Sequence, residues 1–386
     1  METDAVAQAA IHTRLRDIDP GAWDRCAGDD NPFICHAFLR ALEESGSATA
    51  ETGWLGQHIL LTDDAGAPLA AMPLYLKSHS LGEYVFDHGW ADAYGRAGGR
   101  YYPKLQCSVP FTPATGPRLL VPAGGDRTEL RRALASAAIT LAERHQVSSL
   151  HITFAEHEEA AAMSQLGLAI RTDQQFHWQN QGFGTFADFL DALTSRKRKA
   201  IRRERRDALA AEIEIETLTG NDITENHWDH FFQFYMDTGG RKWGRPYLTR
   251  AFFSMIGESL AGRIVLIMAK RGGRYIAGAL NLLGRDIIYG RHWGCAEHHP
   301  FLHFELCYYR AIDYAIEHGL ARVEAGAQGE HKLARGYVPA KTYSAHWIAD
   351  PGFRHAIDDY LEMEKRDVDR AMEILGTYAP FKSGAS

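Results

Sequence analysis

Apolar and polar residues follow two different periods along this chain, and together they predict a mixture of helices and strands. Residues 128–146 and 301–320 carry apolar side chains at helical spacing. Residues 58–64 and 68–80 read as two strands around the turn DDAGAP, and residues 263–295 read as three strands with turns at KRGGR and LGRD. We therefore expect helices packed on mostly antiparallel sheets.

The same order of predicted elements occurs in both halves of the chain. Each half reads as a helix, paired strands, a long helix and two further strands, although sequence identity between the halves is low. This order predicts an α+β fold built from a duplicated unit of roughly 180 residues. We place the first unit at residues 1–185, a basic helical connector at 186–210 and the second unit at 211–386.

Composition narrows the class of protein. The 386 residues are 45% hydrophobic and 24% charged, which is typical of a globular protein of two or three domains. The net charge of -7 gives no overall attraction to nucleic acid, so an anionic partner requires a local basic patch. Five cysteines without C-x-x-C spacing indicate reduced thiols. The sequence has neither a signal-peptide pattern nor a membrane-length apolar run, so we expect a soluble, cytoplasmic protein.

The sequence SRKRKAIRRERR, residues 195–206, holds eight basic residues and one acidic residue. On a helix, Arg198, Arg202 and Arg205 share a face. Like charges at this density repel one another, and the arginine fork matches the geometry of phosphate groups. Two interpretations stay open: a solvated linker helix, or a cradle for the phosphates of a tRNA or nucleotide in which Arg198 or Arg202 makes the contact.

A glycine-rich, charged loop separates the predicted strand ARVEAGA from the predicted strand TYSAHWIAD. Amide formation requires a base for the amine proton and a cation or N–H group for the developing oxyanion. Glu324 and His331 are candidate bases, and Lys332 is the candidate cation. The alternative is a solvated turn with a few ion pairs. The loop also supplies Gln328, Glu330 as a further candidate catalytic residue, and Arg335 as a candidate substrate contact.

The sequence YGRHWGC, residues 289–295, predicts a strand with Arg291 and Trp293 on one face and Tyr289 and His292 against them. At the end of a central strand, Arg291 and His292 are candidates to line a binding cleft. Packed aromatic side chains with a surface arginine are the alternative. Glu305, in the helix that follows, is expected to face this cleft or solvent.

His299, His303 and Cys307 have i, i+4, i+8 spacing, which invites a zinc interpretation. We reject it, because Pro300 places the start of the helix between the two histidines and no outside ligand is evident. Cys295 and Cys307 also lack a partner base in a recognisable nucleophile motif. No metal and no redox cofactor is expected.

Residues 87–113 are rich in aromatic side chains, glycine and proline, and are too irregular for a plain sheet. Trp90, Tyr102 and Lys104 are candidate substrate contacts in a lid or an acceptor groove. The alternative is a structural aromatic loop that packs under the sheet.

Two stretches carry a resemblance to a known family. Residues 193–218 contain the basic helix, and residues 289–337 read as a strand, a long helix, a strand and a turn with Gly329, Lys332 and Gly336. The chain resembles the FemABX-like peptidoglycan aminoacyltransferases, and more narrowly a group of bacterial predicted N-acyltransferases described as FemAB-like.

The resemblance covers nearly the whole chain and implies both a fold and an activity. It implies tandem units of the GNAT acyltransferase fold, each a mixed, mostly antiparallel sheet flanked by helices. It further implies transfer of an acyl or aminoacyl group to an amine. By the same resemblance, an arginine of the basic helix contacts phosphates of the acceptor, Lys332 is functionally important, and the first unit contributes much of the acceptor cleft.

A glycine pattern that is missing from the sequence bears on the identity of the donor. Acyl-CoA-dependent GNAT enzymes hold the pyrophosphate in an R/Q-x-x-G-x-G/A loop at a helix N-terminus. The matching segment, GRHWGCAEHHPFLHF, has Gly294 but lacks the second glycine, and Pro300 removes an N–H donor. We therefore favour aminoacyl-tRNA over acyl-CoA as the donor substrate.

The acceptor is expected to be an amine of a small molecule or peptide. We expect no permanently bound cofactor and no membrane partner, and the oligomeric state stays open. One alternative is an acyl-CoA-dependent N-acyltransferase. Another is a non-catalytic module that binds RNA or a nucleotide through the basic helix.

Overall fold

The computed structural model describes residues 7–124, 127–242, 246–326 and 329–382. The chain forms two compact units. The first contains residues 1–173 and 341–369, and the second contains residues 174–340 and 370–386. This division differs from the expected boundaries, most clearly because residues 341–369 belong to the first unit.

The first unit contains two sheets. A small antiparallel sheet has the order β1 (Gln8–His12), β3 (His58–Thr62) and β4 (Pro68–Met72), and a larger sheet has the order β2 (Trp54–Gly56), β5 (Tyr75–Lys77), β6 (Lys104–Cys107), β7 (Ser149–Ala155) and β14 (Val338–Ile348). Residues 68–80, expected as one strand, are therefore two strands in different sheets. Pro73 lies between them and cannot donate a backbone hydrogen bond.

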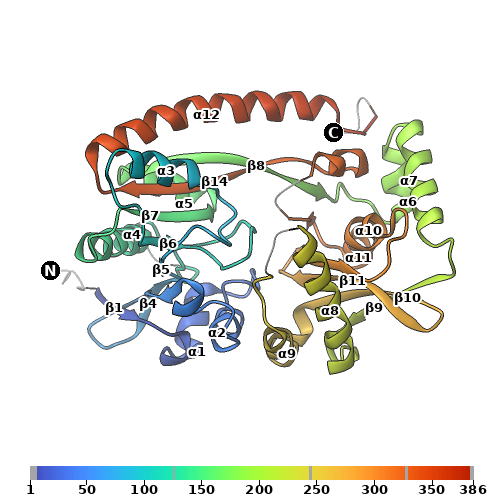
Figure 1. Ribbon diagram of the computed structural model, residues 1–386, viewed down its shortest axis with the longest axis horizontal. Coiled ribbons are helices and arrows are strands. Elements are labelled where there is room, and N and C mark those ends of the chain that lie inside the picture. The colour runs from blue at the N-terminus through green and yellow to red at the C-terminus, as the bar shows by residue number, and fades with distance from the viewer. Residues whose placement is uncertain (1–6, 125–126, 243–245, 327–328, 383–386) are drawn as a thin grey trace. The chain divides into compact units, whose positions relative to one another are not determined.

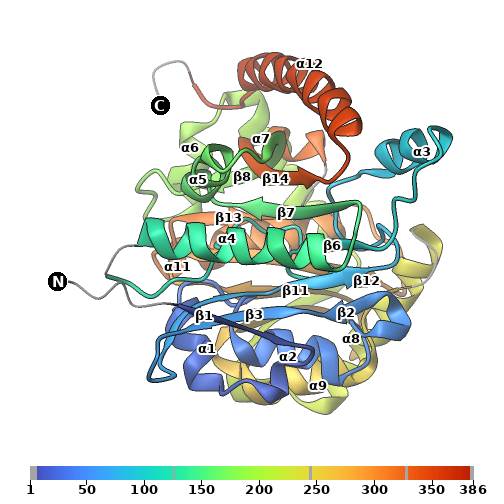
Figure 2. The same ribbon diagram turned by 90° about the vertical axis from the view of Figure 1, so that its left-hand side faces the viewer.

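Helix α4 (Arg127–Arg144) connects the neighbouring parallel strands β6 and β7, and Figure 2 shows it running along the sheet. It packs there because Leu134, Ala138 and Ala142 recur at helical spacing and join the buried core of this unit. The other helices of the first unit are α1 (Pro20–Ala27), α2 (His36–Glu44), α3 (His88–Arg96), α5 (His157–Gln165) and most of α12 (Pro351–Thr377).

The second unit contains one mixed sheet (Figure 1). Its strand order is β8 (Ala169–Gln179), β13 (Arg322–Glu324), β12 (Ile287–Cys295), β11 (Arg274–Leu283), β10 (Ile264–Arg271) and β9 (Ile213–Thr219). Most neighbours are antiparallel, but β12 and β13 are parallel. The helices are α6 (Phe186–Ala192), α7 (Ser195–Ala208), α8 (Glu225–Lys242), α9 (Arg250–Ser259), α10 (Leu302–Phe304) and α11 (Arg310–Glu317).

The sheet of each unit contains one strand that follows the strands of the other unit in the sequence. β8 follows β7 along the chain but pairs with β13, and β14 follows β13 but pairs with β7. The chain therefore crosses between the units twice within strands. A sequence boundary drawn between two consecutive repeats does not predict such an exchange.

The helix expected over residues 301–320 is interrupted. Between α10 and α11 lies η5 (Glu305–Tyr309), a turn of π-helix. Such turns insert one extra residue into a helix and occur often at functional sites. Among the described residues, no helix combines the length and the apolar character that a bilayer crossing requires.

Candidate functional site

A cavity opens in the second unit where two parallel strands separate. β12 pairs with β13 from Ile287 to Tyr289, and this described pairing ends at Glu324. Immediately beyond, β12 bulges at Arg291, because Gly290 and His292 face consecutive residues of β11. The cavity has a volume of about 110 Å³ and lies among β11, the bulge, Ala325 and the η5 turn. A second cavity of about 590 Å³ shares Trp293 and His303 with it.

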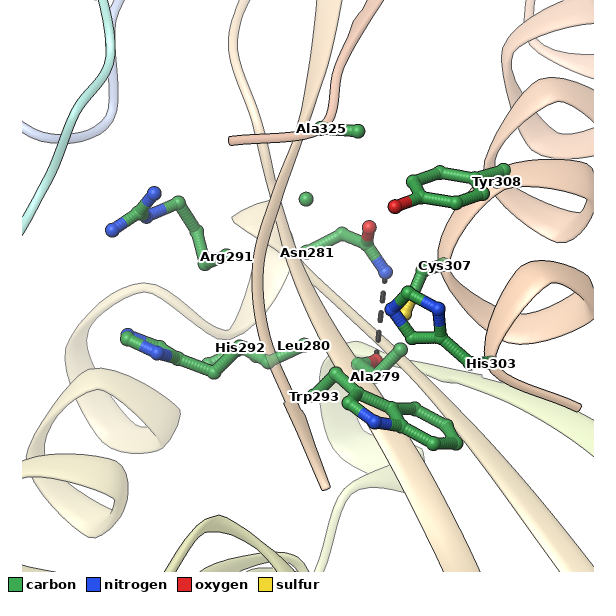
Figure 3. A pocket seen from close by; sticks show the side chains of 11 residues that line it. Ala279, Leu280, Asn281, Arg291, His292, Trp293, His303, Cys307, Tyr308 and Ala325 are labelled. Atoms are coloured by element: carbon green, nitrogen blue, oxygen red, sulfur yellow. Dashed lines mark hydrogen bonds between the residues drawn. The ribbon is translucent and has the colours of Figure 1, made fainter. Parts of the chain in front are cut away.

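The bulge separates two side chains that the sequence pattern placed on one face. Figure 3 shows Arg291 and His292 on one side of β12, whereas Trp293 lies on the other side with His303. The expected shared face of Arg291 and Trp293 was wrong, because the extra residue resets the alternation of side chains. Burial and the neighbouring Arg291 lower the pKa of His292 to about 3. His292 is therefore neutral near pH 7 and adds no positive charge for a phosphate.

Tyr308 lines the cavity and contacts His331. Its hydroxyl oxygen lies 2.9 Å from Nε2 of His331. Tyr308 is provided by η5, and His331 by the short helix η6 (Glu330–Arg335). Burial raises the pKa of Tyr308 well above its usual range, so the phenol keeps its proton near neutral pH. The sequence analysis named His331 as a candidate base but gave Tyr308 no role.

Lys332 and Glu324 are both buried ionisable groups near the end of β13. Lys332 donates a hydrogen bond from Nζ to the backbone carbonyl of Gly326 at 2.8 Å, and burial lowers its pKa to about 8. Burial raises the pKa of Glu324 to about 7, although Arg322 Nε lies 3.0 Å from its carboxylate. Both groups therefore exchange protons close to physiological pH, which suits groups that assist proton transfer.

The structure describes only some of the other candidate residues in the charged loop. Gln328 lies outside the described residues, as does the side chain of Glu330. Arg335 is buried, and its guanidinium donates to the carbonyl of His331 at 2.7 Å and to Glu204 at 2.9 Å. It also lies over the ring of Phe304, 3.4 Å from the centroid. These contacts favour a positioning role, in which Arg335 ties η6 to α7.

Part of the positive charge of helix α7 is paired with acidic side chains of the second unit. Arg205 donates to the carboxylates of Glu305 and Asp313, and Arg310 pairs with Glu305 as well. Glu305 is fully buried, so the expectation that it faces the cleft or solvent was wrong. The two candidate phosphate contacts lie elsewhere on the helix: Arg198 is half-buried and pairs with Asp191 at 2.8 Å, and Arg202 is exposed.

The three candidate residues of the first unit lie in or beside its core. Lys104 is fully buried on β6, where Nζ contacts Glu83 at 2.6 Å and Asp87 at 2.5 Å. A lysine held in this way does not fit the expected lid or acceptor groove. Trp90 is also buried, with its ring edge-to-face with that of His346. Tyr102 is half-buried and shares a hydrogen bond of 2.7 Å with Ser80.

A comparison with protein families matches most of the chain. A family model described as FemAB-like, peptidoglycan biosynthesis/recognition, matches residues 14–383. The chain belongs to the FemAB-like family. This confirms the resemblance carried by the basic helix and the glycine-rich turn. No curated protein sequence matches the chain significantly.

Solved structures are similar to this FemAB-like chain over most of its length. FemX matches with a TM-score of 0.55 and 13% identity, covering 91% of this chain and 100% of that one. The C-terminal domain of a putative lysylphosphatidylglycerol synthetase from Agrobacterium fabrum gives 0.53 and 10%, covering 88% and 94%. L-PGS from Bacillus licheniformis gives 0.50 and 10%, covering 92% and 99%. At these identities the likeness confirms the fold class, and family membership supports an acyltransferase.

Proposed function

We propose that this protein is an N-acyltransferase that moves an aminoacyl or acyl group from an activated donor, with aminoacyl-tRNA favoured, onto an amine of a small molecule or peptide. The observation that carries the proposal is the cavity at the separation of β12 and β13, which is lined by Tyr308, whose hydroxyl contacts His331. An activated acyl group bound there lies beside groups that donate and accept protons.

The reaction we propose is direct attack in a complex of both substrates. The amine nitrogen of the acceptor forms a bond to the acyl carbon, and the ester bond from that carbon to the donor's ribose oxygen breaks. The amine proton passes to a base, either His331 or Glu324, and the Tyr308 hydroxyl supplies a proton to the leaving oxygen. Bringing the two substrates together in this geometry provides much of the rate enhancement.

The donor's phosphates are assigned to helix α7 in this proposal. α7 contacts both η5 and η6, which carry Tyr308 and His331. Lys199, Arg202, Arg203 and Arg206 are exposed on α7, so a polyanion can approach the cavity along a basic surface. Lys332 and Arg335 then hold the loop that positions His331, and Lys332, which donates to the carbonyl of Gly326 just beyond β13, is the candidate cation for the developing oxyanion.

The test is a comparison of donors by thermal shift, followed by transfer. Wild type is mixed with acetyl-CoA, a longer acyl-CoA or a pool of aminoacyl-tRNAs. A ligand at one hundred times its dissociation constant stabilises a protein by about 2.7 kcal/mol, which is readily measured. Stabilisation by aminoacyl-tRNA, with loss of the acyl group to a supplied amine, supports the proposal. Stabilisation by CoA species alone moves the protein to the acyl-CoA-dependent transferases.

A variant pair separates catalysis from binding in this test. Tyr308→Phe should retain the thermal shift but lose transfer, and Tyr314→Phe on α11 is the matched control. Binding of tRNA without transfer by wild type, over a broad set of amines, would favour a non-catalytic module.

A further inference from the structure

Asn281 on β11 places an unsatisfied acceptor at the cavity. The residue is 1% exposed and lines the cavity, yet its Oδ1 has no hydrogen-bond partner among the described residues. An unpaired buried amide oxygen is costly, because it has lost its water without gaining a protein donor. Figure 3 shows the amide between the bulge of β12 and the Tyr308 ring.

The orientation of this amide is fixed by its surroundings. Nδ2 donates to the backbone carbonyls of Val265 at 3.2 Å and Ala279 at 3.5 Å. The flipped amide would set Oδ1 against these two carbonyl oxygens, so the network assigns the oxygen to the cavity side.

Gly290 keeps the space in front of this oxygen open. A Cβ atom at residue 290 would lie 3.5 Å from Oδ1 of Asn281, which is ordinary van der Waals contact. The cavity of about 110 Å³ is far smaller than the roughly 300–1,000 Å³ of pockets that hold drug-sized ligands. The oxygen is therefore available to a small group that enters past Gly290.

We infer that Asn281 is a specificity-determining residue, whose Oδ1 accepts a hydrogen bond from the α-amino group of a small aminoacyl donor. This inference rests on the proposed acyl transfer. The donor's carbonyl lies at the edge of β12 beyond Tyr289, and its amino group reaches the deeper oxygen of Asn281. A plain acyl group of the same size leaves that oxygen unpaired and binds less tightly.

The experiment compares two stable probes that differ in one amino group. The first is 3′-amino-3′-deoxyadenosine with an alanyl group on its 3′-nitrogen. The second carries a propanoyl group on that nitrogen instead. Their amide bonds resist transfer, so titration calorimetry reports binding alone. Wild type should bind the alanyl probe at least about tenfold more tightly than the propanoyl probe, since hydrogen bonds to charged groups are worth this much.

Two variants should remove this preference. Asn281→Leu removes the acceptor, and Gly290→Ala places a methyl group before it at ordinary contact distances. Both should bring the ratio of the two dissociation constants close to one. Gly376→Ala, at an open position on α12, should retain the wild-type ratio. If Asn281→Leu fails to fold, the ratio measured for Gly290→Ala still tests the role of the Asn281 oxygen.

The other possible results of the titrations distinguish failure of the inference from failure of the proposed function. Equal binding of both probes by wild type overturns the inference and leaves acyl transfer standing. A preference that persists in both variants assigns the recognition to another residue and overturns the role of Asn281. Binding of neither probe, together with no transfer from aminoacyl-tRNA, overturns the proposed function along with the inference.

Discussion

The hydroxyl oxygen of Tyr308 lies 2.9 Å from Nε2 of His331, and this contact joins the π-helical turn to the glycine-rich loop. The next residue, Tyr309, points elsewhere and donates its hydroxyl to Glu204 of α7. Two consecutive tyrosines thus fix η5 on one side to the candidate catalytic loop and on the other to the basic helix. Neighbouring side chains of a helix point in different directions, so one turn can make both contacts.

Removal of the Tyr308 hydroxyl should reduce transfer without unfolding the protein. We expect Tyr308→Phe to lower kcat by about 10²–10⁴-fold, the range for loss of a general acid or base. The ring still packs beside Phe304 and Tyr337, so stability should change little. Single-turnover transfer and the melting temperature measure the two effects separately.

Tyr314→Phe is the control for this substitution. Tyr314 lies on α11 and stacks on His318, and it does not line the cavity. An equal loss of activity in both variants, or none in Tyr308→Phe, would contradict a proton-transfer role for Tyr308.

Glu324 should make the stability of the protein depend on pH between about 4.5 and 7. Burial raises the pKa of Glu324 to about 7, so in this range the folded state holds a proton that the unfolded state has released. Stability contributed by the protonated carboxyl is present below pH 4.5 and is lost as the pH rises to about 7. The shift corresponds to about 3 kcal/mol, because each pKa unit is worth 1.36 kcal/mol.

The measurement is urea denaturation of wild type and Glu324→Gln at several pH values. The stability of wild type relative to Glu324→Gln should fall by that amount from pH 4.5 to pH 7. Glu317→Gln, at an exposed position of α11, removes the same charge and should leave the pH dependence of wild type intact. Parallel curves for wild type and Glu324→Gln would show that Glu324 titrates normally.

Much of the fold could be predicted from hydrophobic periodicity. The helix over 128–146 and the three strands over 263–295 are present nearly as expected, since each buries a face at its own regular period. The exchange of β8 and β14 could not be predicted, because local pattern reports which face is buried and not which strand lies beside it. The π turn in residues 301–320 was missed because one extra residue barely changes a helical pattern.

The candidate site was predicted as a segment rather than as an arrangement. Glycines at 326, 329 and 336 all adopt positive φ, as a loop built from freed backbone requires. Asn281 and Tyr308 were missed because each lies inside an apolar run, where a single polar side chain resembles ordinary core sequence. The signal that the sequence offered was one amide side chain, Asn281, within a predicted strand of apolar residues. A binding role follows from it only once the cavity beside it is known.

Arg205 should be a stabilising residue rather than a phosphate contact. Its guanidinium contacts both Glu305 and Asp313, and Glu305 is fully buried. Arg205→Ala leaves Glu305 paired with Arg310. We expect a loss of about 2–3 kcal/mol, below the usual 3–5 for a broken buried pair, because Arg205 is partly exposed.

Chemical denaturation checks this expectation, with Arg206→Ala as the control. Arg206 is exposed and pairs with its neighbour Asp207, so its loss should change stability by less than about 0.5 kcal/mol. The double variant Arg205→Ala with Glu305→Gln should cost less than the sum of the single variants, because it removes both charges of the pair. Strict additivity would contradict the coupling.

Arg202 should contribute to donor binding through charge. It is exposed on α7, on the basic surface assigned to the donor's phosphates. Arg202→Glu should weaken the binding of total tRNA, and the magnitude of the slope of log K against log salt should fall by about 0.7–0.9, the change for one lost phosphate contact. Arg144→Glu on α4 of the first unit changes net charge equally at another exposed position. An equal loss in both variants would mean that net charge alone governs tRNA affinity, and the assignment of the phosphates to α7 would then fail.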